Sequence, residues 1–254
     1  TGSGKTTVAL NIMENANALN QHTMFFSMDM HKNLVYLKLA QKLTSYSQRD
    51  ILDFYKYKNT KKIDEIKDLI SQKYGKTFFD FSSTLTLDQM RDKIFKVEDE
   101  TGSPIKLVIV DYAGRVTGPY SDRYANATYN ALRSTEIANV TNSAWIYISQ
   151  ISRNVGDGCA PLRTKRAAKE SGDWEESATN VITMWRPFMG SPEHDDVMRM
   201  FLAKNRMGKE LETLLRFQGD KGVVRDMSID ELADYAALRE GEEREYLKSK
   251  FNKG

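Results

Sequence analysis

Short apolar runs alternate with amphipathic stretches through the first 150 residues of the chain. Runs typical of buried strands occupy residues 23–28, 78–81, 105–112 and 144–150. Between them, apolar residues recur at helical spacing in 8–13, 34–43, 63–70, 86–97 and 130–140. Strands that alternate with helices indicate a mostly parallel sheet flanked by helices. The pattern therefore predicts an α/β fold.

The pattern changes after residue 150. Residues 151–176 are polar and predict a long loop. Apolar runs at 181–185 and 198–203 predict two more strands, and Met207-Gly208 predicts a turn into 213–218, which forms a C-terminal antiparallel hairpin. We therefore predict one domain over residues 1–227, followed by a charged, helix-prone tail over residues 228–254.

Composition narrows the class of protein. The chain has 254 residues, of which 40% are hydrophobic and 28% charged, as in a globular protein with a full core. The net charge is only +2, so any nucleic-acid-binding surface must be a local concentration of charge. No apolar run is long enough to span a membrane, and the N-terminus does not read as a signal peptide. The single cysteine, Cys159, excludes an internal disulfide and fits a reducing cytoplasm.

The first seven residues match the end of a phosphate-binding loop, G-x-x-x-x-G-K-[ST], whose leading glycine would lie before residue 1. Glycines allow backbone N–H groups to approach phosphate oxygens, and the helical pattern that follows predicts a helix N-terminus, which favours anions. Lys5 would contact the β- and γ-phosphates of a nucleotide such as ATP, and the Thr6 hydroxyl would bind Mg²⁺. The candidate nucleotide-binding residues are Gly2, Ser3, Gly4, Lys5, Thr6 and Thr7. The alternative is a Gly/Ser-rich linker that happens to precede a lysine.

Polar residues end two of the predicted strands. Asp111 follows the most apolar run of the chain, where a carboxylate at the edge of a parallel sheet would support the metal ion. The alternative is an aspartate that caps the next turn. Gln150 ends the following strand, where its amide would sense the γ-phosphate.

The order of these motifs resembles the C-terminal motor domain of DnaB-type replicative helicases, which are hexameric and have a RecA-like P-loop NTPase core. The similarity extends to about Met227. It is carried by residues 2–7, 25–30, 81–87, 108–112, 149–153, 169–172 and 203–208.

The resemblance implies roles for further residues. Asp29 lies where the family usually has the glutamate that orients the attacking water, and it is one methylene shorter. Lys204 and Arg206 resemble the basic pair that reaches the nucleotide of a neighbouring subunit, and their spacing would put both side chains on one face of a strand. Without the resemblance, the pair would be interpreted as a solvated edge strand.

The resemblance also implies contacts with single-stranded DNA. Lys169, Glu170 and Gly172 resemble a loop that binds DNA in the central channel of the ring. A second channel loop is expected over residues 114–129, where Arg123 would contact DNA and tyrosines such as Tyr120 would stack on bases.

We therefore expect an ATP-dependent and Mg²⁺-dependent helicase motor that acts as a homohexamer and has a primase and a helicase loader as possible partners. One alternative is a RecA-like regulatory or recombination-mediator ATPase without unwinding activity, which the replacement of glutamate by Asp29 favours. A phosphoryl transferase is a further alternative, although the chain offers no separate acceptor domain.

Overall fold

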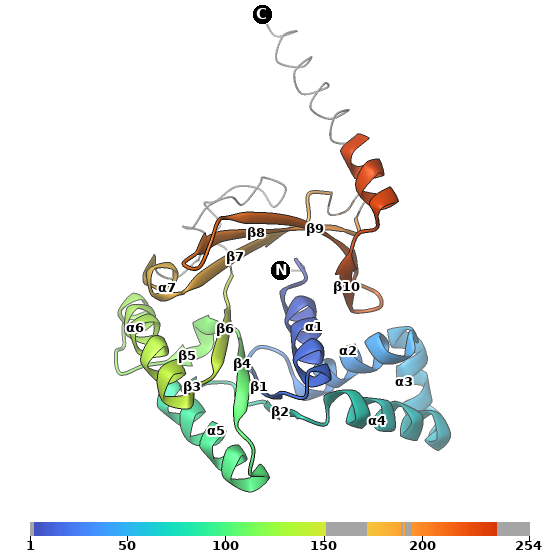
Figure 1. Cartoon of the computed structure of the whole chain (residues 1–254). Helices are drawn as coiled ribbons and strands as arrows, with labels where there is room; N and C mark the ends of the chain where they lie inside the picture. Colours follow the sequence, from blue (N-terminus) through green and yellow to red (C-terminus); the bar gives the residue numbers. More distant parts are fainter. Residues whose placement is uncertain (1–2, 151–171, 189, 191–194, 238–254) are drawn as a thin grey trace, which may run out of the picture.

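The computed structural model describes residues 3–150, 172–188, 190 and 195–237. Its centre is a four-stranded sheet whose strands pair in parallel in the order β2-β1-β4-β6 (Figure 1). These strands are β1 (His22–Ser27), β2 (Thr77–Asp80), β4 (Ile105–Asp111) and β6 (Ala144–Ile148). The predicted α/β fold is thus confirmed, and each of these strands lies within a few residues of its predicted position.

Helices cover both faces of the parallel sheet, because successive strand residues point to opposite sides. Phe25 and Ile109 pack with α1 and α2 on one face, whereas Phe26 and Val110 pack with α5 and α6 on the other. The helices are α1 (Lys5–Ala18), α2 (Lys32–Thr44), α3 (Gln48–Lys56), α4 (Thr60–Tyr74), α5 (Leu87–Thr101) and α6 (Arg123–Thr141). The 3₁₀ turn η1 (Ala113–Arg115) and the short paired strands β3 (Leu85–Thr86) and β5 (Val116–Thr117) complete this layer.

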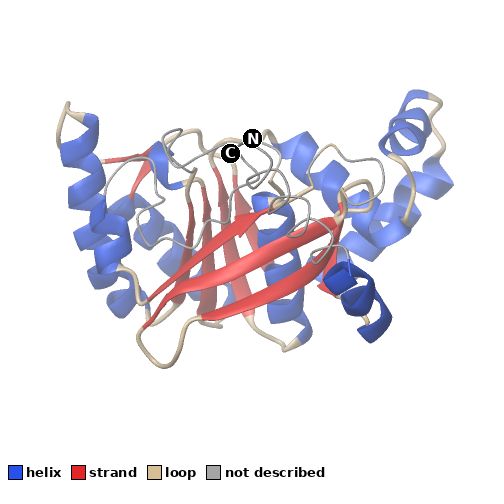
Figure 2. Cartoon of the chain, turned by 90° about the horizontal axis from the view of Figure 1, so that it is seen from above, coloured by secondary structure: helices blue, strands red, loops and turns tan. Residues whose placement is uncertain are grey.

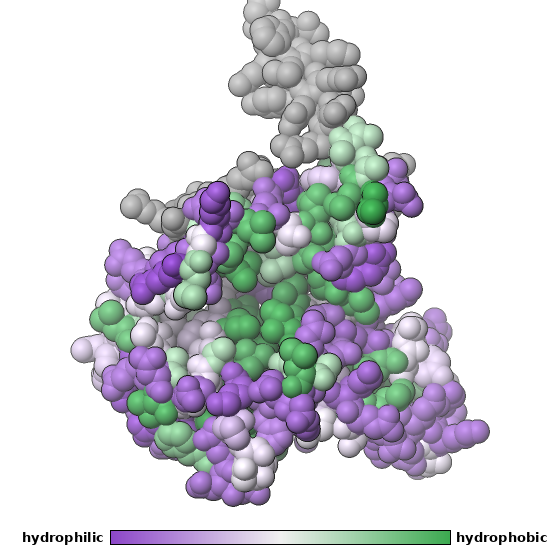
Figure 3. Space-filling view, in the orientation of Figure 1, coloured by the Kyte–Doolittle hydropathy of each residue, from purple (hydrophilic) through white to green (hydrophobic). Residues whose placement is uncertain are grey.

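A second, antiparallel sheet crosses over the parallel strands (Figure 2). It contains the predicted hairpin, β8 (Val197–Asn205) and β9 (Leu211–Gln218), and the predicted strand β7 (Asn180–Trp185) at one edge. The strand at the other edge, β10 (Val223–Asp226), is not among the predicted strands. Val8 of α1 packs against Met198 and Phe217 of this sheet. Apolar side chains therefore gather in the hollow between the two sheets (Figure 3). Helix α1 thus packs between the antiparallel sheet and the parallel sheet.

Two segments predicted as loops are helical. Helix α6 begins at Arg123 rather than near residue 130, because the Asp122 side chain caps it by accepting a hydrogen bond from the Ala125 N–H at 2.7 Å. The second expected channel loop, 114–129, is therefore wrong as a continuous loop. Helix α7 (Gly172–Ser177) occupies the end of the predicted loop 151–176, where the sequence has no apolar periodicity over so short a stretch. Helix α5 begins close to the predicted start of the 86–97 helix, where Thr86 caps it and Gln89 completes the capping box.

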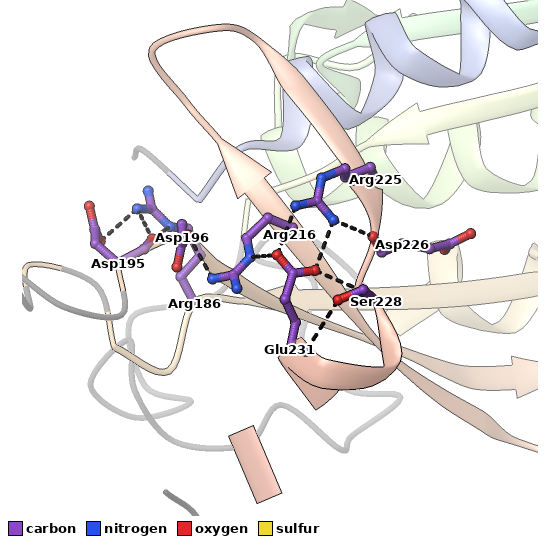
Figure 4. Close-up of polar contacts among 8 residues, drawn as sticks. All are labelled: Arg186, Asp195, Asp196, Arg216, Arg225, Asp226, Ser228 and Glu231. Atoms are coloured by element: carbon purple, nitrogen blue, oxygen red, sulfur yellow. Dashed lines mark hydrogen bonds and ion pairs between the residues drawn. The ribbon is translucent and has the colours of Figure 1, made fainter. Parts of the chain in front are cut away.

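Residues 229–237 form a helix that continues from the antiparallel sheet. Tyr235 is buried with Val197 and Met227, and Ser228 and Glu231 cap the helix through reciprocal hydrogen bonds. The Glu231 carboxylate also binds the guanidinium groups of two arginines from the sheet, Arg216 at 3.0 Å and Arg225 at 2.8 Å (Figure 4). The boundary at residue 227 stays a prediction, but Glu231 and Tyr235, which lie beyond it, contact the sheet.

We predict that Glu231→Ala frees the 229–237 helix. Hydrogen bonds from Arg225, the Ser228 backbone and Arg216 hold the pKa of Glu231 far below its ordinary value of 4.5. Its contribution is therefore fully present above pH 4.5 and is lost only as the pH falls toward the lowered pKa. Hydrogen exchange of this helix at pH 7 should be faster in the variant, whereas Asp230→Ala, at an exposed neighbouring position, should change it little. Equal protection in the two variants would contradict this assignment.

Candidate nucleotide-binding site

The phosphate-binding loop ends at Gly4, which has a φ of 87°, and α1 begins at the next residue. A Cβ built on Gly4 would lie 2.6 Å from the Phe217 ring and 2.7 Å from the Met198 methyl group. Glycine is therefore needed for both its backbone conformation and its space. The unpaired N–H groups of the first turn of α1 lie at this end of the helix, so the loop offers an anion-binding N-terminus. Gly2 lies outside the described residues.

Asp111 is the last residue of β4 and accepts a hydrogen bond from the Thr6 hydroxyl, with a distance of 2.6 Å between Thr6 Oγ1 and Asp111 Oδ2. Only 6% of Asp111 is exposed. The two residues are 105 positions apart in the chain, and their contact joins the start of α1 to the carboxyl edge of the parallel sheet. The sequence predicts a metal-associated role for each residue, and the structure brings the two together.

The electrostatics of the site are those of a buried carboxylate, Asp111, near a half-buried ammonium group, Lys5. Burial raises the pKa of Asp111, the Thr6 hydrogen bond opposes this, and the charge of Asp29 adds to it. Burial lowers the pKa of Lys5, and the charge of Asp111 opposes this effect. The Lys5 ammonium donates to Ser3 Oγ at 3.2 Å. The charged forms of Asp111 and Lys5 are thus less favourable here than in water. A cation bound near Asp111 would offset the cost of burying its negative charge.

The oxygen atoms at this edge fit Mg²⁺. Thr6 Oγ1 and Asp111 Oδ2 are hard oxygen donors that already lie in contact, and Mg²⁺ commonly takes one or two protein ligands together with water and substrate phosphates. No cluster of three or more His, Cys, Asp or Glu residues that could hold a metal occurs in the described part of the chain. These two residues would therefore hold the ion together with the nucleotide.

Asp29 and Gln150 lie at the same edge. Asp29 comes two residues after β1, is 45% exposed in its side chain, and contacts the Arg115 guanidinium at 3.5 Å. Gln150 comes two residues after β6, whose last residue, Ile148, pairs with Asp111. The carboxyl ends of three neighbouring parallel strands thus carry the candidate base, the metal-associated carboxylate and the candidate sensor. The sequence places Arg115 in the expected DNA loop and gives no sign of its contact with Asp29.

The remaining candidates lie elsewhere. Lys204 lies near the end of β8, and Arg206 lies one residue beyond the strand rather than within it. The side chains of Lys204 and Arg206 both donate hydrogen bonds to the Glu176 carbonyl, so they point toward the same neighbouring helix. Arg123 and Gly172 are the first residues of α6 and α7. Lys169 and Glu170 lie outside the described residues, and Thr7 is buried in the first turn of α1.

The phosphate-binding loop, the parallel sheet and the strand-terminal Asp111 define the class of RecA-like P-loop proteins. Within that class, the sequence matches the family described as the DnaB-like helicase C terminal domain over residues 1–225. The chain belongs to this family, which confirms the resemblance found from the motifs. None of the helices described is long and apolar enough to cross a membrane.

Relatives and solved structures agree with this assignment. The chain is 26% identical over 226 residues to the replicative DNA helicase DnaB of Haemophilus influenzae, and 28% identical over 228 residues to a probable replicative DNA helicase of Trieres chinensis. These matches cover 85% of this chain but 47% and 49% of the relatives, so the chain spans about half their length.

Two solved structures share the fold at 18% identity, and each match covers 90% of this chain. One is an ATPase domain, of which 82% is covered at a TM-score of 0.79. The other is a DnaB-like replicative helicase described with its interactions with primase, of which 56% is covered at a TM-score of 0.78.

We predict opposite effects of Asp111→Asn on stability and on nucleotide binding. Because burial raises the pKa of this carboxyl above 3.8, the group favours folding below pH 3.8 and this contribution is lost as the pH rises through the folded pKa. At pH 7 without nucleotide, the variant should therefore unfold at a higher temperature than the wild type. Its gain in unfolding temperature on addition of Mg²⁺ and ATP should be smaller.

The exposed Asp99→Asn variant, on α5, is the matched control and should change neither quantity. A lower unfolding temperature for the nucleotide-free Asp111→Asn protein, or an undiminished gain with Mg²⁺ and ATP, would contradict the assignment of Asp111.

Proposed function

We propose that this domain is the ATP-hydrolysing motor of a replicative DNA helicase, which translocates on single-stranded DNA and unwinds duplex DNA as a homohexameric ring. The observation that carries the proposal is the meeting of Lys5, the Thr6–Asp111 pair and Asp29 at one sheet edge, in a chain of the DnaB-like family. Such a site would bind a nucleoside triphosphate and hydrolyse it.

The roles of the residues follow from their places. Backbone N–H groups of the loop, from Gly2 to Thr7, would hold the phosphate oxygens, and Lys5 would place its charge on the β- and γ-phosphates. Thr6 and Asp111 would hold Mg²⁺, which neutralises charge on the β- and γ-oxygens when it is bound. Gln150, at the neighbouring strand end, would hydrogen-bond the γ-phosphate and respond to its loss.

Asp29 would orient the attacking water and accept its proton. The Arg115 guanidinium lies beside it and would have to leave the carboxylate free to face the water. This contact, and the shorter side chain, favour slow basal hydrolysis. The Asp29–Arg115 contact and the shorter side chain of Asp29 also support the alternative function, a RecA-like regulatory or recombination-mediator ATPase without unwinding activity. Strand separation by the full chain distinguishes the two proposals.

Arg206 and Lys204 would complete the nucleotide site of a neighbouring subunit. Arg206 is exposed at the end of β8, as a residue that reaches another subunit must be. A guanidinium group at the γ-phosphate stabilises the charge of the transition state. The side chains of Lys169 and Arg123 and the backbone N–H groups of Glu170 and Gly172 would contact the phosphates of single-stranded DNA. A primase and a helicase loader would be partners of the assembled ring.

We predict that Lys5→Ala abolishes hydrolysis without unfolding the domain. Since burial disfavours the charged form of Lys5, its removal should leave the unfolding temperature unchanged or higher. Steady-state ATPase rates with and without single-stranded DNA, together with circular dichroism, check both points. Lys96→Ala, which removes an exposed lysine of α5, is the control and should hydrolyse ATP like the wild type. Normal turnover in Lys5→Ala would overturn the assignment of the loop.

We predict that Arg206→Ala retains nucleotide binding but loses about a thousandfold in DNA-stimulated hydrolysis. If Arg206 acts on a neighbour, a mixture of Lys5→Ala and Arg206→Ala subunits should regain part of the activity, since some junctions then contain both residues. Arg49→Ala, an exposed position on α3, is the control. No recovery in mixed rings would show that Arg206 acts within its own subunit.

A further inference from the structure

The short helix α7 contacts three separate parts of the domain. The Trp174 ring packs on the Tyr147 ring of β6, with 4.8 Å between their centroids. The Asp173 carboxylate accepts a hydrogen bond from the Thr128 hydroxyl of α6. At the other end of α7, backbone carbonyls accept hydrogen bonds from the end of β8. A helix of 6 residues is thus held at both ends by side chains from distant elements.

The contacts with the end of β8 come from the candidate basic pair. The Lys204 ammonium donates to the carbonyls of Glu175 at 2.8 Å and Glu176 at 2.7 Å, and Arg206 Nη2 donates to the Glu176 carbonyl at 3.2 Å. The Arg206 backbone N–H also donates to the Thr179 carbonyl at 3.3 Å. The last carbonyls of a helix have no partners within the helix and favour cations. Within a single subunit, the pair therefore caps α7.

Trp174 connects this helix to the candidate nucleotide site. Tyr147 is next to the last residue of β6, and Gln150 lies three positions after it. Tyr147 pairs with Val110 of β4, immediately before Asp111. The two rings are in contact and partly buried, so a displacement of one displaces the other. A shift of the strand end that carries Gln150 would thus move Tyr147, and with it Trp174 and α7.

These contacts lead to an inference that rests on the proposed function. We propose that Trp174 is a positioning residue through which α7 couples the strand end at Gln150 to the basic pair at the end of β8. Lys204 and Arg206 exchange their hydrogen bonds with α7 for the phosphates of the neighbouring subunit's nucleotide. Helix α7 begins at Gly172, the last candidate DNA contact, so the exchange changes the affinity for DNA. In this proposal the nucleotide site and the DNA-binding site both act on α7, which has two arrangements.

The test measures the coupling between nucleotide and DNA in the full chain. The affinity for a fluorescent oligothymidylate is measured by anisotropy with and without Mg²⁺ and a non-hydrolysable ATP analogue. In the wild type, the nucleotide should change this affinity by a factor of about 5 or more. In Trp174→Ala the factor should fall toward one, while nucleotide affinity without DNA stays within about twofold. Trp174→Phe retains an aromatic ring and should restore most of the factor.

Tyr147→Phe is the matched control, because its ring remains and the lost hydroxyl has no hydrogen-bond partner among the residues described. It should leave the coupling factor unchanged. Thr128→Val loosens α7 without changing its aromatic anchor, and should lower the factor even if Trp174→Ala fails to fold.

The outcomes separate the two proposals. A wild type that couples and variants that couple equally well would overturn the role of Trp174 and α7 alone. A wild type that neither hydrolyses ATP nor links nucleotide to DNA would overturn the proposed function together with this inference.

Discussion

The hydrogen bond between Thr6 and Asp111 is the contact on which the arrangement of the site depends. An isolated carboxylate buried at the end of a strand costs several kcal/mol unless partners compensate it. Here the Thr6 hydroxyl and the charge of Lys5 compensate it in part, and both belong to the first turn of α1. The protein's own side chains thereby hold the start of α1 against β4. The remaining electrostatic cost of this arrangement favours a cation at the site.

The antiparallel sheet has a structural role at this site as well as a candidate role in trans. Phe217 and Met198 pack so closely on Gly4 that no larger residue would fit there. Asn11 of α1 reinforces the contact by donating to the Gly222 carbonyl beside β10 at 3.1 Å. The end of the phosphate-binding loop and the start of α1 therefore contact both sheets. A movement of one sheet relative to the other would change the conformation of the loop.

Several parts of the fold and site are predictable because their causes are local. Apolar runs predict β1, β4 and β6, and the acid that ends the run at Asp111 predicts the position of the carboxylate. Two segments predicted as loops are helical, because the local signals that start or form these helices are weak in the sequence. Helix α6 begins at Arg123 because of one cap at Asp122, and α7 is too short for its periodicity to be recognised.

The sequence by itself determined the class of fold, the phosphate-binding loop and the family, because glycine spacing and strand hydrophobicity are local properties and the order of the motifs is visible along the chain without the fold. Only the tertiary structure decided that Arg115 contacts Asp29 across 86 positions, and that Lys204 and Arg206 cap α7. These contacts join residues from separate elements. They depend on how helices and strands pack in three dimensions, and no local pattern of the chain specifies that packing.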